Sequence, residues 1–254
     1  MAPSVSIITP TGRRDALLRL QHANVLRQTN QDFEWLILDD SPTPSSYFVG
    51  LDDPRIRYQH YSGPRLTIGE KRNRLIAAAN ATTIAHFDDD DFYTPHYLEF
   101  MIARLAHGAD AAKFSGFFVY GLSSKFLGYW DVPATRGMHR QISSAPGIKF
   151  VDFGPTAPQL LEDSILGFGF SYVYRRALWE KVRFTDQNLS EDRIFLKAAH
   201  NSGFKLDIFP DTKGLALVIT GGPDNISQCF PQYSLPSFML VQLFGAEVLP
   251  MLAR

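Results

Sequence analysis

The sequence predicts an α/β fold built on a mostly parallel sheet, and three observations lead to this expectation. Short β-rich runs alternate with helical stretches up to about residue 110, a pattern typical of parallel sheets. Polar side chains directly follow several of these runs, at the strand ends where open parallel sheets bind ligands. The chain has 254 residues, of which 45% are hydrophobic, so one large domain can bury a core without disulfides.

The strands expected in the first half are runs of β-branched and aromatic residues that end at proline or polar side chains. They comprise residues 4–9, 33–38, 56–60 and 82–87, of which the third is the weakest. The helices expected between and after them repeat apolar residues at helical spacing. They comprise residues 15–28, 69–79 and 95–107.

The second half of the chain has a different pattern. Aromatic residues and glycines interleave over residues 113–130, as in strands of a mixed or antiparallel region. Residues 131–165 contain many prolines and glycines with little periodicity, so we expect a long loop of the kind that often covers a binding site. The later elements are expected at residues 170–174, 176–181, 193–201 and 215–219, followed by an apolar tail at 235–254.

The composition excludes several classes of function. The formal net charge is -1, so the overall charge favours neither nucleic acid nor an anionic membrane surface. The one cysteine, Cys229, excludes an intrachain disulfide and a cysteine-based zinc site. No signal peptide is recognisable, and no apolar run approaches the roughly 20 residues that span a bilayer. We therefore expect a cytoplasmic protein that binds no nucleic acid and has no transmembrane segment, with peripheral membrane association left open.

Four consecutive aspartates, Asp88 to Asp91, follow the expected strand at residues 82–87. Such carboxylates repel one another by roughly 1 kcal/mol per close pair in a water-like dielectric, and a divalent cation removes that cost. Oxygen ligands suit Mg or Mn, which also bridge phosphate oxygens. The alternative is a solvated acidic turn in which Asp91 caps the helix that begins near Pro95. The preceding strand and the paired carboxylates after the second strand favour the metal site.

Other acidic and phosphate-binding motifs fit poorly. A calcium-binding helix–loop–helix loop needs glycine where Tyr93 stands, and an aspartyl phosphatase signature needs threonine or valine where Phe92 stands. Gly12 stands alone after the first strand, so the glycine-rich dinucleotide fingerprint is absent from the sequence, as is any P-loop motif. Dinucleotide oxidoreductases and P-loop enzymes are therefore disfavoured.

The order of motifs resembles that of the family 2 glycosyltransferases, which have the GT-A nucleotide-diphosphosugar fold. The matching segments are VSIITPT at residues 5–11, VLRQT at 25–29, ILDDS at 37–41, IGEKRN at 68–73, FDDDD at 87–91 and SED at 190–192. No single segment is decisive, but their common order and spacing over residues 3–205 make the resemblance fairly specific.

The resemblance implies a fold and a division of the chain. The fold would be of the GT-A type, with a Rossmann-like, mostly parallel sheet flanked by helices and a smaller mixed region on the acceptor side. Residues 1–254 would form a single domain. Its parts would be a nucleotide-binding half at 1–110, an acceptor-binding half at 111–234 and the apolar tail at 235–254.

The resemblance also implies an activity and roles for individual residues. The chain would be an inverting, metal-dependent hexosyl- or pentosyltransferase that uses a nucleotide-diphosphate sugar, favouring a UDP-sugar, and a glycan or other hydroxyl acceptor. The residues placed around the nucleotide sugar are Thr9, Pro10, Thr11, Arg13, Asp40, Lys71, Arg72, Asp88 and Asp89. Among them, Asp40 would accept from the base and Arg72 would flank it. Asp90 would bind the metal, Mn or Mg, that bridges the diphosphate.

The catalytic base is expected in the Ser-Glu-Asp segment. An inverting transfer needs a base that takes the acceptor hydroxyl proton, and it forms no covalent intermediate. Asp192 would be this base on the motif match, with Glu191 as its rival. A carboxylate near a helix N-terminus tends to stay ionised, and adjacent residues there point in different directions, so one of the two is expected to face the sugar.

One departure from the family pattern concerns the metal site. Many relatives carry a histidine shortly before an Asn-x-Ser near the end of the domain, but residues 220–227 contain no histidine. We therefore expect one protein carboxylate, the diphosphate and waters around the metal, with Asp224 as a substitute ligand. For the acceptor side, Tyr129 and Trp130 are candidates for stacking on a sugar, with core packing as the alternative.

Less specific interpretations stay open. Asp40 can cap a turn, Lys71 and Arg72 can form a solvated helix face, and the acidic pair at 191–192 can be helix caps. His86 is expected to be a packed histidine rather than a ligand. For the whole chain, the alternatives are a nucleotidyltransferase that makes a nucleotide sugar and a catalytically inactive nucleotide or carbohydrate binder. The apolar tail is expected to pack on the domain or to form a homo-oligomer.

Overall fold

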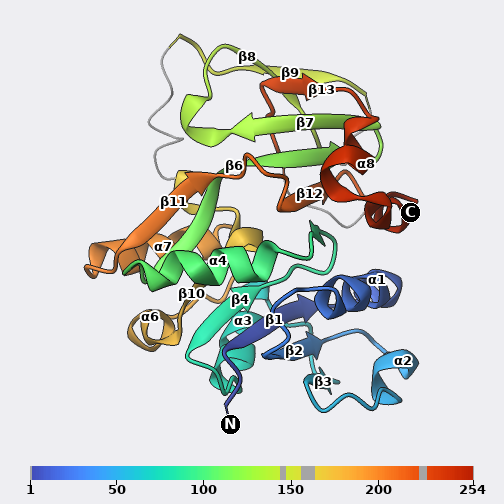
Figure 1. Cartoon of the computed structure of the whole chain (residues 1–254), viewed down its shortest axis with the longest axis vertical. Coiled ribbons are helices and arrows are strands. Elements are labelled where there is room, and N and C mark those ends of the chain that lie inside the picture. Colours follow the sequence, from blue (N-terminus) through green and yellow to red (C-terminus); the bar gives the residue numbers. More distant parts are fainter. Residues whose placement is uncertain (1, 144–146, 156–163, 223–227, 254) are drawn as a thin grey trace. The chain divides into compact units, whose positions relative to one another are not determined.

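The computed structural model describes residues 2–143, 147–155, 164–222 and 228–253 (Figure 1). They fall into two compact units. The first comprises residues 1–89, 95–113 and 166–207, and the second comprises residues 90–94, 114–165 and 208–254. Asp224, the suggested substitute metal ligand, lies outside the described residues. No helix among the described residues is both long and apolar enough to span a membrane.

The first unit contains a sheet with the order β10-β4-β1-β2-β3. Its parallel strands are β1 (Val5–Thr11), β2 (Phe33–Asp39), β3 (Ile56–His60) and β4 (Thr83–His86). The short strand β10 (Val173–Arg175) runs antiparallel to β4. All seven residues of β2 are buried, as expected for a strand covered on both faces. The α/β prediction and the position of each N-terminal strand are thus confirmed.

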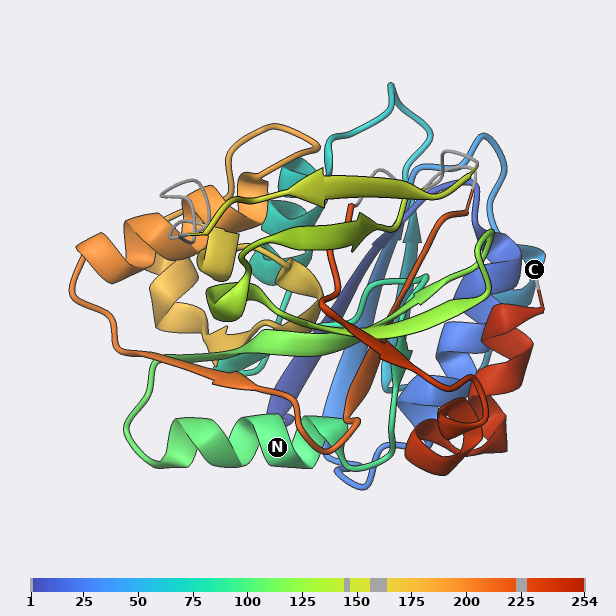
Figure 2. The ribbon, with the colours of Figure 1, turned by 90° about the horizontal axis from the view of Figure 1, so that it is seen from above.

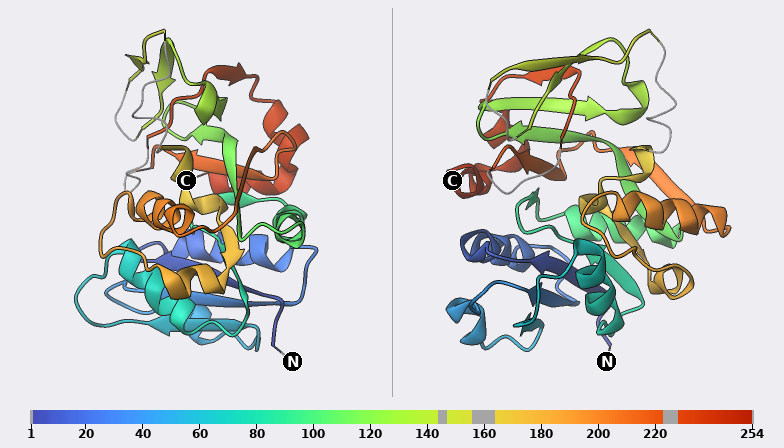
Figure 3. Two further views of the ribbon diagram at one scale, coloured as in Figure 1. Left: turned by 90° about the vertical axis from the view of Figure 1, so that its left-hand side faces the viewer. Right: turned by 180° about the vertical axis from the view of Figure 1, so that it is seen from behind.

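Helices cover both faces of this sheet (Figure 3). On one face lie α3 (Ile68–Ala77), α6 (Arg176–Lys181) and α7 (Glu191–Asn201). On the other face lie α1 (Asp15–Leu26) and α4 (Tyr97–Ala106). The short helix α2 (Ser46–Val49) connects β2 to β3. The core beneath α3, α6 and α7 includes Ile8, Leu36, Leu75, Leu178 and Phe195.

Two boundaries in the first unit differ from expectation in ways that affect the site. Helix α7 begins at Glu191, two residues before the expected start, so the acidic pair lies within its first turn. The 3-10 turn η3 (Gly169–Ser171) takes the place of the start of the strand expected at residues 170–174, and β10 begins only at Val173. There the Gly169 amide donates to Asp192 and the Tyr172 amide donates back to the Gly169 carbonyl oxygen, which apolar composition alone does not reveal.

The second unit is a mixed region, as expected. Its strands are β5 (Phe92–Tyr93), β6 (Ala111–Gly121), whose first three residues belong to the first unit, β7 (Phe126–Asp131), β12 (Ala216–Thr220) and β13 (Tyr233–Leu235). β12 is parallel to β6, whereas β7 is antiparallel to it. A further strand, β11 (Leu206–Pro210), also pairs with β6.

The expectation of a structureless loop over residues 131–165 is wrong for part of that segment. After the 3-10 turn η1 (Val132–Ala134), β8 (Met138–Gln141) and β9 (Lys149–Asp152) run side by side as an antiparallel pair (Figure 2). His139 is buried, and its Nδ1 lies 2.6 Å from the carbonyl oxygen of Phe230. This anchor is 91 residues away in the chain, so local periodicity does not predict the pair.

The acidic run does not lead directly into a helix. Asp91 Oδ1 accepts a hydrogen bond from the Ile219 amide at 2.9 Å within the second unit, and β5 follows it. Because α4 begins only at Tyr97, the expectation that Asp91 starts the next helix is wrong. Trp130, a candidate for sugar stacking, is buried and donates to Thr135 Oγ1 at 2.8 Å, which fits the alternative of core packing.

The C-terminal tail packs within the second unit. It forms α8 (Met239–Phe244), η4 (Ala246–Val248) and α9 (Leu249–Leu252). The buried Phe244 ring makes edge contacts with Phe92 and Phe118. The prediction that the tail packs on the domain is therefore confirmed for these helices, while the homo-oligomer stays a prediction.

Candidate functional site

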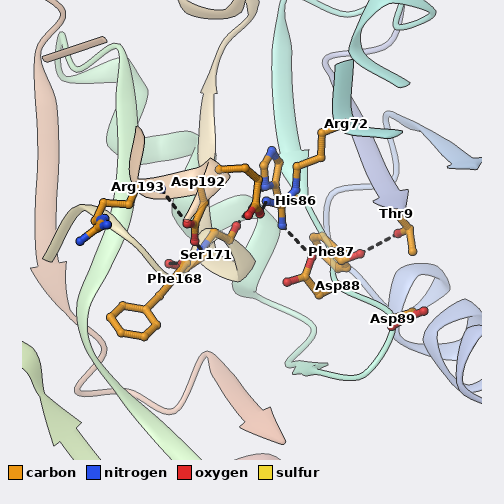
Figure 4. A network of polar contacts seen from close by, with 12 residues as sticks. Thr9, Arg72, His86, Phe87, Asp88, Asp89, Phe168, Ser171, Asp192 and Arg193 are labelled. Atoms are coloured by element: carbon orange, nitrogen blue, oxygen red, sulfur yellow. Dashed lines mark hydrogen bonds and ion pairs between the residues drawn. The ribbon is translucent and has the colours of Figure 1, made fainter. Parts of the chain in front are cut away.

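The carboxyl ends of β1, β2 and β4 bring the expected polar residues to one edge of the first unit's sheet. Thr11 at the end of β1 is in register with Asp39 at the end of β2. Thr9 donates a hydrogen bond to the Phe87 carbonyl oxygen at 2.7 Å, which joins the end of β1 to the segment after β4 (Figure 4). Pro10 lies between the two threonines and is partly exposed.

Asp89 is held from two sides and is 3% exposed. Its Oδ2 accepts from the Thr11 hydroxyl at 2.5 Å, and its Oδ1 pairs with Arg14 Nη1 at 2.8 Å. Arg13, the neighbour of Arg14 in the chain, is the arginine expected around the nucleotide sugar. Arg13 is exposed, and its amide donates to Ser41 Oγ at 2.6 Å. The arginine that reaches the acidic run is therefore its neighbour Arg14, which the motif match alone did not distinguish.

Asp40 and Lys71 form a buried ion pair with 2.6 Å between Oδ1 and Nζ. Lys71 Nζ also donates to the Thr11 carbonyl oxygen at 2.7 Å, and Asp40 Oδ2 accepts from the Leu66 amide at 2.9 Å. Burial lowers the pKa of Lys71, while Asp40 acts in the opposite direction. Lys71 is thus not part of a solvated helix face.

The turn after β2 is capped by Asp39, which the sequence analysis did not single out. Asp39 Oδ1 accepts from the Ser41 amide at 2.8 Å, and Oδ2 accepts from the Tyr58 hydroxyl at 2.6 Å. The capping role considered for Asp40 therefore belongs to its neighbour. Paired aspartates at a strand end alternate in direction, which could have suggested this division.

Arg72 connects two of the expected acidic residues. Its Nη1 lies 2.5 Å from Glu191 Oε1, and its Nη2 lies 3.4 Å from Asp88 Oδ1 (Figure 4). Burial lowers the pKa of Arg72, but the negative charges of Glu191 and Asp88 raise it, and the net shift is upward. Burial raises the pKa of Glu191, with Arg72 opposing that shift. Arg72 is 4% exposed, so it too is not part of a solvated helix face.

Asp192 and Glu191 lie in the first turn of α7 but have different surroundings. Glu191 is 5% exposed and faces Arg72. Asp192 is partly exposed, and its Oδ2 accepts from the Gly169 amide at 2.8 Å. The helix N-terminus favours an ionised carboxylate at both positions. Of the two, Asp192 is the carboxylate that solvent reaches, which agrees with the motif match.

His86 at the end of β4 is a packed residue, as expected. Its Nδ1 lies 3.0 Å from the Gly169 carbonyl oxygen, which only accepts, so Nδ1 carries the proton. Its Nε2 lies 3.1 Å from the Tyr174 hydroxyl. Burial, followed by the charge of Arg72, lowers the pKa of His86 well below its usual range. A neutral His86 thus connects β4 to the turn that contacts Asp192.

The described residues contain no group of three or more histidine, cysteine or carboxylate side chains that could hold a metal ion. Asp90 follows Asp89 in the chain and is partly exposed. One accessible carboxylate fits Mg or Mn, which keep several waters and bind through one or two carboxylates together with substrate phosphates. The donor set therefore fits a metal that arrives with a diphosphate.

Comparison with known proteins gives a consistent family. The model of the family described as "Glycosyl transferase family 2" matches residues 6–153. A colanic acid biosynthesis glycosyl transferase, WcaA of Escherichia coli K12, is 36% identical over 109 residues, which cover 40% of this chain and 38% of that protein. The glycosyltransferase EpsJ of Bacillus subtilis 168 is 26% identical over 227 residues, or 87% of this chain and 60% of that protein. The chain thus spans 38% and 60% of the length of these two relatives.

Solved structures share the fold at low sequence identity. TarS 1-349 of S. aureus in complex with UDP has a TM-score of 0.61 and 15% identity, covering 87% of this chain and 61% of that one. The mannosyltransferase PcManGT of Pyrobaculum calidifontis, in complex with GDP-Man and Mn2+, has a TM-score of 0.58 and 14% identity, covering 88% and 58%. These likenesses confirm the expected GT-A fold.

Proposed function

Because the chain belongs to glycosyl transferase family 2 and has its GT-A fold, we propose that it transfers a sugar from a nucleotide-diphosphate donor to a hydroxyl group. The donor is a UDP-sugar, the acceptor is a glycan or another alcohol, and the transfer inverts the anomeric carbon. The observation that carries this proposal is the pair at the start of α7, where buried Glu191 is engaged by Arg72 and partly exposed Asp192 accepts from Gly169.

The residues at the strand ends are assigned to the donor. Thr9, Pro10 and Thr11 line the nucleobase side, with Asp40 and Lys71 beneath them as a buried pair. The further donor residues are Arg13, Arg72, Asp88 and Asp89. Arg72 contributes by pairing its guanidinium with the Asp88 carboxylate. UDP is favoured as the nucleotide because TarS is solved with UDP, whereas the GDP-Man complex of PcManGT makes GDP the alternative to test.

Asp192 is assigned as the general base. Its carboxylate takes the proton of the acceptor hydroxyl as that oxygen attacks the anomeric carbon. The bond from this carbon to the diphosphate oxygen breaks, and its electron pair leaves with the nucleoside diphosphate. Two amides hold the carboxylate: Gly169 donates to Oδ2 at 2.8 Å and Arg193 donates to Oδ1 at 2.6 Å. A fixed base orientation lowers the entropic cost of the proton transfer.

Asp90 is assigned to the divalent metal, Mn or Mg. When bound, the ion would stabilise the negative charge that develops on the departing diphosphate. The chain's own contribution is the partly exposed carboxylate of Asp90. In the same run, Asp88 pairs with Arg72, Asp89 accepts from Thr11 and Asp91 accepts from the Ile219 amide. Residues 1–110 are assigned to the nucleotide and residues 111–234 to the acceptor, within a single functional domain.

The test measures donor binding and turnover in the wild type and in two variants, Asp192→Ala and Asp90→Ala. UDP affinity is measured calorimetrically with and without Mn2+, and UDP release is followed with a panel of UDP- and GDP-sugars. Wild type is expected to bind UDP more tightly with Mn2+ and to release UDP from one donor. Asp192→Ala keeps UDP affinity and loses turnover, whereas Asp90→Ala loses the effect of Mn2+ on affinity. Metal-independent binding, or full turnover in Asp192→Ala, contradicts the proposal, and turnover of a nucleoside triphosphate with a sugar phosphate indicates a nucleotidyltransferase instead.

A further inference from the structure

The segment at residues 166–169 includes the Gly169 amide, which donates a hydrogen bond to Asp192. Side chains from other parts of the first unit donate hydrogen bonds to the backbone carbonyls of this segment. The Tyr172 hydroxyl donates to the Leu166 carbonyl oxygen. Lys113 Nζ donates to the Gly167 carbonyl oxygen at 2.6 Å. His86 Nδ1 donates to the Gly169 carbonyl oxygen at 3.0 Å. The backbone next to the proposed base is therefore fixed at several successive positions.

Two residues with left-handed backbone conformations belong to this region, Phe168 within the segment and Ser190 directly before α7. Phe168 has φ 64° and ψ 61°, the left-handed region that bulky side chains rarely adopt. Ser190, directly before α7, also has a φ of 64°. Such conformations persist where the surroundings hold them, and they cluster at functional sites. Lys113 donates to the Gly167 carbonyl oxygen directly before Phe168, and the Gly169 amide directly after it donates to Asp192 (Figure 4 labels Phe168 and Asp192).

The burial of Lys113 at this position is unfavourable for the free energy of folding. It lies in β6, is 1% exposed, and its Nζ lies 5.7 Å from the ring centroid of Phe168 and 6.0 Å from that of Tyr172. Burying an ammonium is unfavourable, and an apolar side chain of similar length is often neutral or stabilising. Burial lowers the pKa of Lys113 to about 7, and the charge of Asp192 acts against that shift.

Charged and ionisable groups on several elements of the first unit bear on the site around Lys113 and Asp192. On α7, Asp192 is the one whose charge acts on Lys113, and Asp192 and Glu191 both act on Arg72. Between η3 and β10, the ring of Tyr172 lies against Lys113, and burial raises the pKa of Tyr172. On β11, Asp207 is engaged by Arg104 at 2.6 Å. The carboxylate of the proposed base is therefore one of the charges that act on the ammonium of Lys113.

We propose that Lys113 is a positioning residue for Asp192, an inference that rests on the proposed function. Its Nζ holds the Gly167 carbonyl and with it the strained turn at Phe168, so that the Gly169 amide fixes Asp192 Oδ2. Its positive charge favours the ionised carboxylate that accepts the proton from the incoming hydroxyl. Lys113 acts through the backbone and through its charge, and it touches neither the donor nor the acceptor.

The experiment compares Lys113→Met, which removes the charge and the donor, with Lys113→Gln, which keeps N–H donors without the charge. Lys205→Met serves as the control because Lys205 is an exposed lysine of the same unit. The readouts are kcat and KM for UDP release from the UDP-sugar that wild type uses, UDP affinity, the pH profile of kcat and the thermal midpoint.

Lys113→Met is expected to lose roughly tenfold in kcat, as supporting residues of a site commonly do, with KM and UDP affinity within about twofold. The acid limb of its kcat profile moves to higher pH, because Lys113 is charged below about pH 7 and that charge is gone. Lys113→Gln recovers part of kcat through its N–H donor but keeps the shifted acid limb. Lys205→Met matches wild type.

The role of Lys113 is overturned if Lys113→Met keeps the wild-type kcat and pH profile. It is equally overturned if kcat and UDP affinity fall together with an unchanged profile, as a general loss of structure would cause. Should Lys113→Met lack a cooperative thermal transition, the profile of Lys113→Gln decides, and a wild-type profile there refutes the proposal. A wild-type chain that releases no UDP from any donor overturns the proposed function itself, and this inference with it.

Discussion

Arg72 in α3 and Glu191 in α7 form an ion pair of 2.5 Å whose side chains are only 5% and 7% exposed. The two residues are 119 positions apart in the chain, so the pair ties two helices of the first unit together beside the proposed base. Removing one member of such a pair leaves the other charge buried without its partner, which costs much more than the pair itself contributes.

We expect Arg72→Met to lower the free energy of unfolding by about 3–5 kcal/mol, the range for breaking a buried pair. Urea denaturation of wild type and variant measures the difference. Arg74→Met is the matched control, because Arg74 lies in the same helix and pairs with Glu70 at 2.8 Å, with side chains 42% and 34% exposed. This exposed pair should contribute less than about 1 kcal/mol. Equal losses in the free energy of unfolding for the two variants would show that the buried Arg72 pair contributes no more to stability than the exposed Arg74 pair.

The order of strands and helices in the first unit could be predicted because it depends on local apolar patterns. The carboxyl ends of β1, β2 and β4 could be predicted as a site for the same reason, since parallel strand ends must meet. The burial of Lys71 and Arg72 could not, because basic residues on a helix usually face water. Their carboxylate partners are 16 to 119 residues away, and no local pattern records such distances.

Adjacent identical residues set another limit on what the sequence predicts. Asp39 and Asp40 share a motif, yet one caps a turn and the other pairs with Lys71. Arg13 and Arg14 divide in the same way. In each case the local backbone direction decides which neighbour faces inward, and Arg13 has a φ of 62° that a motif does not encode. Lys113 lies in an aromatic strand with no motif, so only its contacts reveal it.

A second prediction concerns stability in acid. Glu34 accepts hydrogen bonds from Ser6 at 2.6 Å, from Asn80 and from Arg57. Burial raises the pKa of Glu34, but these hydrogen bonds together lower it below the usual 4.5. Because the folded-state pKa is the lower one, the ionised carboxylate contributes stability above the unfolded value, and that stability is lost as the pH falls through the folded value.

Glu34→Gln should therefore be less stable than wild type at neutral pH, and the difference should shrink as the pH drops below about 4. Urea midpoints measured between neutral pH and the acid transition give the comparison. Glu180→Gln is the control, since Glu180 is 58% exposed in an i,i+4 pair with Arg176. A difference between Glu34→Gln and wild type that stays constant with pH would contradict the assignment.

A third prediction tests the approach of α3 to the segment before α7. A Cβ on Gly69 would lie 1.9 Å from the Thr185 carbonyl oxygen, a backbone atom that cannot simply rotate away. Alanine favours a helix over glycine by about 1 kcal/mol, so without this clash Gly69→Ala would be stabilising. We expect it instead to lose about 1–3 kcal/mol, the usual range for overpacking. Thermal or urea unfolding measures the sign directly, and a stabilised variant would refute the close approach.

A fourth prediction tests the buried pair at the proposed donor site. A Cβ on Gly12 would lie 2.1 Å from Asp40 Oδ1 and 3.3 Å from Lys71 Nζ. Gly12→Ala must therefore displace the Asp40 carboxylate from its partners, Lys71 and the Leu66 amide. If this pair supports the nucleotide pocket, UDP affinity should fall about tenfold or more, which equals about 1.4 kcal/mol of binding free energy.

Gly50→Ala provides the matched control for Gly12→Ala. Its Cβ would meet its nearest neighbour, the Ser46 carbonyl oxygen, at an ordinary 3.5 Å, and its φ of -90° suits alanine. Gly50→Ala should keep both UDP affinity and stability, with a small gain from a less flexible unfolded chain. The informative outcome is a loss of UDP affinity in Gly12→Ala that exceeds its loss of stability. Wild-type affinity in a variant whose Asp40–Lys71 pair is displaced would remove this pair from the donor site, because a pocket that rests on it cannot tolerate its movement.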